Sequence, residues 1–174
     1  MSSSEGARLQ RAKAAFVAQW GVLGSAWGTN RSVAQVHALL LVSHEPLSQD
    51  EIMEELVISR GNVATSLREL VDWGLVRPVV TTGDRRYYYE AEKDVWKIAC
   101  AVARERSRRE IEPVVDALRR LVDETAGSET AAGKHFHRQV GELLRYAEIA
   151  RKFLDSLARK ERSSFLPKLL RLTV

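Results

Sequence analysis

Cysteine is almost missing from this chain of 174 residues, in which Cys100 stands alone. One cysteine excludes an intrachain disulfide framework and offers no metal-binding spacing. We expect Cys100 to be a small buried residue on a helix, with a redox-sensing thiol as the alternative. No apolar run approaches the roughly 20 residues that cross a bilayer, and the start, MSSSEGARLQR, lacks the apolar centre of a signal peptide. These absences predict a cytoplasmic protein.

Motifs of catalysis and metal binding are missing as well. The sequence contains no nucleophile elbow, no phosphate-binding glycine loop and no paired-carboxylate motif. His135 and His137 lie two positions apart on a predicted helix, so their side chains point about 200° apart and cannot grip one ion. We therefore expect no enzyme, no bound metal and no cofactor.

The charge that is present is unevenly distributed. The net charge is +4, but residues 47–90 hold five Lys/Arg against eight Asp/Glu, whereas residues 128–174 hold ten against five. Nucleic-acid binding in the acidic stretch would therefore depend on placement rather than on total charge. The arginines needed on one face are Arg60, Arg68, Arg77, Arg85 and Arg86, and the acids needed elsewhere are Asp50, Glu51, Glu54 and Glu55.

The stretch SRGNVATSLRELVDW, from Ser59 to Trp73, is predicted to be a helix with two different faces. Ser59 can cap its start, and Gly74 supplies the left-handed residue that ends it. An apolar stripe at helical spacing faces a core, while the opposite face is, apart from Asp72, small, polar or cationic and could approach a DNA major groove. An ordinary amphipathic surface helix is the alternative. The candidate DNA-binding residues of this helix are Ser59, Arg60, Gly61, Asn62, Thr65, Ser66 and Arg68.

The neighbouring segments favour the DNA-binding interpretation. Ser32 can cap an apolar helix that runs through Val42, and Ser48 with Glu51 forms a capping box for a short helix to about Leu56. This short helix and the one after Ser59 make a helix-turn-helix. LVRPVV and RYYYE then read as two strands around the turn TTGDR, with Pro78 on an unpaired edge, so a hairpin wing follows.

These residues resemble a known family. The run from PLSQDEIMEELVISRGNVATSLREL to WGLVRPVVTTGDRRYYYEAEKDVW is similar to the winged-helix core of the MarR superfamily, and most similar to its GbsR-like branch. The resemblance covers about residues 32–96 and implies a dimeric transcriptional regulator whose helix enters the major groove. Repressors of this branch respond to osmolyte-related ligands such as choline, but no ligand-binding motif can be matched here.

The resemblance also implies that a wing arginine, Arg85 or Arg86, approaches the minor groove. Independently, a narrow minor groove concentrates negative potential, which suits an arginine at a hairpin tip. A solvated hairpin end is the alternative. The candidate wing residues are Arg77, Thr82, Asp84, Arg85 and Arg86.

Long helices flank the winged segment. The first begins near Ala7 and ends before Thr29; later, Pro113 should kink or split a helix near Glu110–Glu112. In the last helix, apolar residues step by four and three over three repeats, which favours packing against another long helix. We expect a two-fold dimer, with an intrachain bundle as the alternative. The dimer residues are Leu9, Phe16, Phe136, Val140, Leu143, Leu154, Leu157, Phe165 and Leu169.

The expected fold is mainly α: a winged helix-turn-helix with a small hairpin wing and long terminal dimerisation helices. We divide it into residues 1–30 (N-terminal dimerisation helix), 31–93 (DNA-binding domain) and 94–174 (C-terminal dimerisation region). Expected partners are double-stranded DNA, a second copy and a small-molecule effector. A protein-interaction module without sequence-specific DNA binding is the alternative function. A candidate ligand pocket, or else hinge packing, comprises Trp20, Trp27, Trp73, Tyr88 and Trp96.

Overall fold

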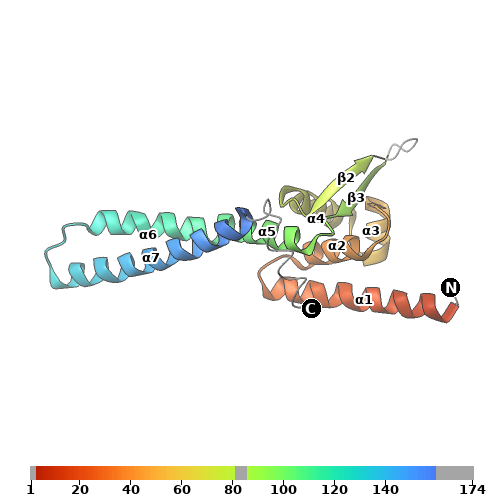
Figure 1. The fold of residues 1–174 in the computed structure, drawn as a ribbon, viewed down its shortest axis with the longest axis horizontal. Coiled ribbons are helices and arrows are strands. Elements are labelled where there is room, and N and C mark those ends of the chain that lie inside the picture. The colour runs from red at the N-terminus through yellow and green to blue at the C-terminus, as the bar shows by residue number, and fades with distance from the viewer. Residues whose placement is uncertain (1–2, 81–85, 160–174) are drawn as a thin grey trace. The chain divides into compact units, whose positions relative to one another are not determined.

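The computed structural model describes residues 3–80 and 86–159, which form helices and one small sheet (Figure 1). Contacts divide the chain into two compact units, residues 1–94 and 95–174. Among the described residues, no helix is both long and apolar enough to cross a membrane. The elements are α1 (Ser3–Ala26), α2 (Arg31–Val42), β1 (Leu47–Ser48), α3 (Gln49–Leu56), α4 (Arg60–Asp72), β2 (Val76–Val80), β3 (Tyr87–Ala91), α5 (Val95–Arg106), a π-helical turn (Ser107–Ile111), α6 (Glu112–Thr125) and α7 (Ala131–Arg159).

Two glycines let α1 lie close to α2 in the first unit. A methyl group on Gly24 would sit 2.4 Å from Ala34 Cβ, and one on Gly21 would sit 2.7 Å from Gln35 Cγ. The helix nevertheless continues through both glycines to Ala26. Glycine lowers the intrinsic stability of a helix, but the close packing on α2 compensates for the poor helix propensity of these two residues.

The cap of α2 differs from the sequence-based expectation. Asn30, not Ser32, is the N-cap, and its side-chain oxygen accepts from the backbone N–H of Ser32 at 2.8 Å. Both residue types are good caps, so sequence alone did not distinguish them. At the other end, Lys93 Nζ donates to the carbonyls of Leu40, Leu41 and Ser43 at 2.7–2.9 Å, which closes the last turn.

The two helices of the helix-turn-helix begin as predicted. The capping box of α3 is formed between Ser48 and Glu51, and the Ser59 hydroxyl accepts from Asn62 N–H at the start of α4. Gly74 has a φ of 73° and ends the turn that follows α4. Leu75 N–H then donates to Leu70 O at 2.9 Å, so the chain folds back on the last turn of α4.

The turn between α3 and α4 contains an unusual backbone conformation. Val57 has a φ of 53°, in the left-handed region, and the residue is 89% exposed. A β-branched residue is strained there. Two hydrogen bonds offset this strain, because Val57 N–H and Ile58 N–H both donate to Met53 O. These bonds end α3 and turn the chain toward α4.

The sheet has three antiparallel strands in the order β1-β3-β2. The predicted hairpin of β2 and β3 is present, and Pro78 lies on the edge strand β2, where a missing N–H is tolerated. Strand β1 was not predicted from the sequence; it has two residues and pairs Leu47 with Tyr89 and Ser48 with Tyr88. Because Ser48 also caps α3, β1 ties the wing to the helix-turn-helix.

The core of the first unit is aliphatic and includes one histidine. The largest fully buried side chains come from α2, α3 and α4, and they include Leu40, Ile52 and Leu70. His37 is buried on α2 with its ring 6.4 Å from that of Trp20. Burial, helped by the charge of Lys93, lowers the pKa of His37 to about 4. The imidazole is therefore neutral at physiological pH.

The second unit is a helical hairpin. Its first arm is interrupted before Pro113, as the sequence predicts, by a π-helical turn in which Glu112 N–H donates to Ser107 O. The Ser107 hydroxyl is buried and donates to Asp155 of α7 at 2.8 Å. Cys100 is also buried, as expected, and its thiol lies 3.3 Å from Leu157 O.

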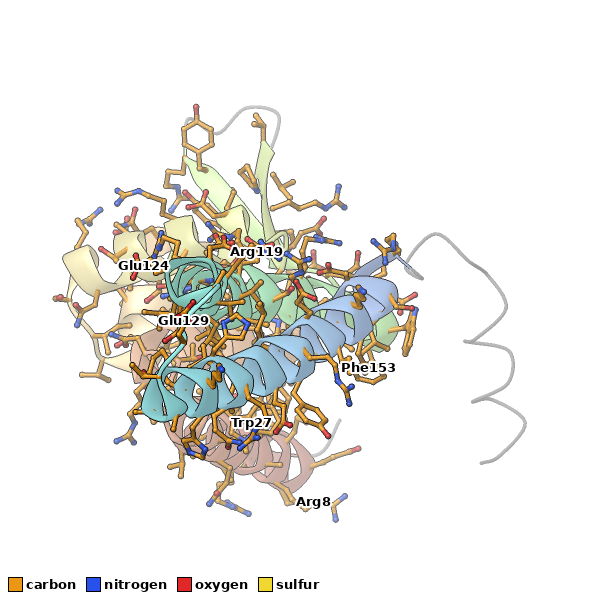
Figure 2. The ribbon with its side chains drawn as sticks, turned by 90° about the vertical axis from the view of Figure 1, so that its left-hand side faces the viewer. Arg8, Trp27, Arg119, Glu124, Glu129 and Phe153 are labelled. Atoms are coloured by element: carbon orange, nitrogen blue, oxygen red, sulfur yellow. The ribbon has the colours of Figure 1, made fainter. Side chains whose placement is uncertain are left out.

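An ion pair joins the two arms of this hairpin. Arg119 of α6, labelled in Figure 2, donates to Glu148 of α7 at 2.6 Å. This hydrogen bond is the main reason that the pKa of Glu148 is lowered. Intrachain packing, which the sequence analysis gave only as the alternative to a dimer, therefore covers part of the α7 surface but does not bury every apolar residue of the helix.

Candidate nucleic-acid interface

The outward face of α4 carries the side chains expected to meet DNA. Helical spacing puts Val63, Leu67 and Leu70 in the core, and this fixes the rotation of the helix. The exposed residues that result include Ser59, Arg60, Gly61, Asn62, Thr65 and Arg68; Val71 and Asp72 are also exposed, in the last turn of the helix. From Ser59 to Arg68 the exposed surface is therefore small and polar, with a cation at each end.

Ser66 requires a correction. We expected it among the DNA-facing residues, but it is 2% exposed and belongs to the core. Ser66 lies three residues after Val63 and one before Leu67, both buried, so helical geometry rotates it inward. A hydroxyl in that position cannot touch a ligand outside the subunit.

Gly61 is exposed without an intrachain reason to be glycine. It lies within α4, its φ is not positive, and a methyl group built there would meet nothing within 4 Å. Glycine lowers helix stability relative to alanine. The absence of a side chain at this point leaves the first turn of α4 open to close approach from outside.

The start of α3 is joined to the start of α4 by two side chains. Gln49 Nε2 donates to the Arg60 carbonyl at 3.1 Å, and Arg60 Nη2 donates to Asp50 Oδ1 at 2.5 Å. The expectation that all the acids turn away from the arginines is therefore wrong for Asp50. The sequence did not predict this contact, because Asp50 and Arg60 are ten positions apart. The turn between α3 and α4 brings them together, and the periodicity within a helix does not show such a contact.

The structure describes the two strands of the wing and Arg86, which precedes β3. Arg77 on β2 is exposed and forms an ion pair with Glu90 across the hairpin. Arg86 is exposed, and its guanidinium carbon lies 5.6 Å from the centre of the Tyr88 ring, a cation–π distance. The remaining candidate wing residues, Thr82, Asp84 and Arg85, lie outside the described residues.

The five aromatic residues of the candidate ligand pocket differ in how exposed they are and in the unit to which they belong. Trp20 packs on Phe16, with ring centres 5.3 Å apart, and on His37, whereas Trp27 is 59% exposed. Trp73 and Tyr88 are half-buried in the first unit, and Trp96 belongs to the second unit.

A hollow of about 360 Å³ occurs instead between α1, α2 and α3. Its apolar floor includes Val17, Leu39 and Leu56, and charged side chains such as Lys13 and Glu55 line it as well. None of the five aromatic candidates lines this hollow. The sequence held no signal for it, because its lining comes from α1, α2, β1, α3 and the loop after α2, which only the fold brings together.

The candidate dimer residues are divided between the inside and the outside of their units. Val140 is buried where α7 packs on α6, and Leu154 and Leu157 are half-buried. Leu9, Phe136 and Leu143 are exposed, Phe16 is half-buried beside Trp20, and Phe165 and Leu169 lie outside the described residues. The exposed stripe of α7 also contains Tyr146, Ile149 and Phe153, of which Phe153 is labelled in Figure 2.

A short capped helix, a tight turn, a second helix with a polar outer face and a hairpin directly after it are the parts of a winged helix-turn-helix protein. That is the class to which the first unit belongs, and the fold class predicted from sequence is confirmed.

Comparison with known proteins finds a family match over about a third of the chain. Residues 27–86 match the sequence model of the MarR family. The HTH-type transcriptional repressor GbsR of Bacillus subtilis (strain 168) is 28% identical over 92 residues, which cover 53% of this chain and 51% of that repressor. The chain therefore matches only about half the length of this curated relative. These matches bear out the resemblance to the MarR superfamily and its GbsR-like branch.

A solved structure is similar in fold to most of this chain. A chain described as the crystal structure of a transcriptional regulator has a TM-score of 0.62 and 24% sequence identity. The match covers 87% of the present chain and 99% of that chain. The helices outside the winged unit are therefore part of a known architecture as well.

Proposed function

We propose that this protein is a cytoplasmic transcriptional regulator that binds double-stranded DNA as a homodimer and represses transcription under the control of a small effector. The outer face of α4 would lie in the major groove and the wing would reach the neighbouring minor groove. The MarR-family match and the likeness to a named repressor support this assignment.

The observation that carries the proposal is the exposed surface of α4. Arg68 and Asn62 are side chains that form paired hydrogen bonds with guanine and adenine edges. Gly61, in the first turn, leaves room for the DNA backbone where free helix N–H groups suit a phosphate. An amphipathic surface helix with no partner would not need a glycine there.

The dimer is proposed from apolar surface on the long helices. Leu143, Tyr146 and Phe153 expose more than half of their surface on α7, and Val22 and Trp27 are similarly exposed at the end of α1 and just beyond it. Exposed apolar side chains at such density favour association. A two-fold dimer would set two copies of α4 about 34 Å apart, one turn of DNA.

Binding is tested with the DNA upstream of the protein's own gene, by footprinting and by fluorescence anisotropy against a random duplex. Replacing Arg68 by Ala should reduce the preference for the footprinted sequence, by about 1–3 kcal/mol for each bidentate base pairing that the arginine makes. Gly61→Ala should weaken binding to both duplexes while raising helix stability. Equal loss on all DNA from Arg68→Ala would contradict the base-reading role.

The effector is proposed from the family resemblance together with the hollow between α1, α2 and α3. A ligand that alters how α1 packs would change the spacing of the two copies of α4. Calorimetric titration with choline and with glycine betaine tests this part, and flat traces with both would exclude these two compounds as effectors.

The rival function is a winged-helix module that docks a protein on the same surface. The acidic balance of residues 47–90, with Asp50 at Arg60, is the observation in its favour. Binding to random duplex that weakens steeply as salt is raised would exclude it, because counterion release accompanies phosphate binding.

A further inference from the structure

Arg60, at the first turn of α4, is held from both sides by the start of α3. Gln49 fixes its backbone carbonyl, and Asp50 accepts from its guanidinium. The Arg60 side chain is 64% exposed and that of Asp50 is 46% exposed. An ion pair this exposed contributes little to folding stability, so stability alone gives a weak reason for the pairing.

The ion pair has a geometric consequence for any anion at this place. Arginine has five N–H donors in a fixed planar fork. The Asp50 carboxylate takes a hydrogen bond at Nη2, so the remaining edge of the fork stays available next to the free N–H groups that begin α4. An arginine in solvent samples many rotamers, and the hydrogen bond to Asp50 restricts the rotamers of Arg60 before any ligand binds.

We propose that Asp50 is a positioning residue for DNA binding, which orients the Arg60 guanidinium toward a backbone phosphate at the N-terminus of α4. Gln49 assists by holding the Arg60 backbone. The inference rests on the proposed function. Asp50 would then support DNA binding, although its negative charge alone predicts that it weakens binding.

The two possible roles of Asp50 predict effects of opposite sign. If Asp50 acts only through its charge, then removing that charge raises affinity for a polyanion. If it orients Arg60, removing the acceptor lowers affinity even though the surface becomes more positive. Glu54 provides the matched control, because it is an exposed acid on the same short helix.

The experiment measures the affinity of the full chain for a labelled random duplex of about 30 base pairs, long enough for two half-sites one turn apart. Asp50→Ala should weaken binding by about two- to fivefold per bound subunit, the range for an exposed ion pair. Asp50→Asn, which keeps an acceptor oxygen, should restore most of the affinity. Glu54→Ala should leave affinity unchanged or raise it.

A double-mutant cycle separates positioning from a general effect on α3. Arg60→Ala should weaken binding and reduce the salt slope by about 0.9 for each phosphate that is no longer neutralised. In that background Asp50→Ala should have no further effect. The inference fails if Asp50→Ala binds as tightly as wild type, or weakens binding by the same factor with and without Arg60. If the wild type binds no duplex, the proposed function itself fails.

Discussion

At the scale of single residues, Val57 shows how a turn can be imposed on an unsuitable side chain. Its backbone is left-handed because the chain must leave α3 after Leu56 and turn within three residues to begin α4 at Arg60. Its side chain is almost fully exposed, so it gains little from packing.

Replacing Val57 by Gly should raise the free energy of unfolding by about 1 kcal/mol, because glycine adopts this conformation without a steric penalty. Val57→Asn should give a smaller gain, since asparagine tolerates the left-handed region better than valine. Urea unfolding measures both. A loss of stability in Val57→Gly would show that the valine side chain is itself stabilising.

His37 makes a second prediction at this scale, on pH. Its pKa is lowered from 6.5 to about 4 in the folded chain, so the unfolded chain takes up a proton more readily between these values. Folding stability from this group is therefore complete above pH 6.5 and is lost as the pH falls toward 4. Between pH 7 and 4.5 the loss should be about 2 kcal/mol.

Urea unfolding at the two pH values checks this, with His37→Gln as the comparison. The variant should be less stable at pH 7 but should lose less stability on acidification than the wild type. Identical pH dependence in the two proteins would mean that His37 is not the group responsible.

At the scale of elements, the packing of α1 on α2 depends on the absence of side chains. Gly24 has no room for a methyl group, because Ala34 Cβ would lie 2.4 Å away and is not a flexible atom. Gly6, on the same helix, has nothing within 4 Å of the same added group.

Gly24→Ala should therefore destabilise the protein by about 1–3 kcal/mol through overpacking, despite the better helix propensity of alanine. Gly6→Ala is the matched control and should be neutral or slightly stabilising. Thermal unfolding followed by circular dichroism measures both. Equal effects of the two substitutions would contradict close packing at Gly24.

At the scale of the whole molecule, part of the apolar surface of α7 is exposed to solvent. The hairpin with α6 buries Val140 but leaves Leu143 and Phe153 mostly exposed. The heptad-like spacing in the sequence therefore describes two adjoining surfaces, of which only one is used within the unit.

Leu143→Glu combined with Phe153→Glu should convert a dimer to a monomer at micromolar concentration, because two charges would be buried without partners. Light scattering measures the mass. Lys134→Glu, an exposed charge reversal near the start of α7, is the control and should leave the dimer intact. A monomeric wild-type protein would overturn the proposal, and with it the two-fold arrangement on DNA.

Local patterns in the sequence determined where several helices and the hairpin begin and end. The capping box of α3, the cap of α4, the glycine after α4 and the apolar stripe of α4 all involve neighbours within a few positions, so spacing alone located them. The hairpin and the interruption before Pro113 follow from residues whose backbone limits are intrinsic. The domain division at residues 30 and 93 stays a prediction, as do the dimer and ligand residues and the DNA-binding residues other than Ser66.

Tertiary structure alone decided which residues distant in sequence meet one another. The two-residue strand that ties Ser48 to Tyr88, the fit of Gly24 against Ala34 and the pairing of Asp50 with Arg60 leave no periodic trace. Each depends on how one element is placed against another. Periodicity reports which face of a helix is apolar, but not which atom of a neighbouring element it will meet.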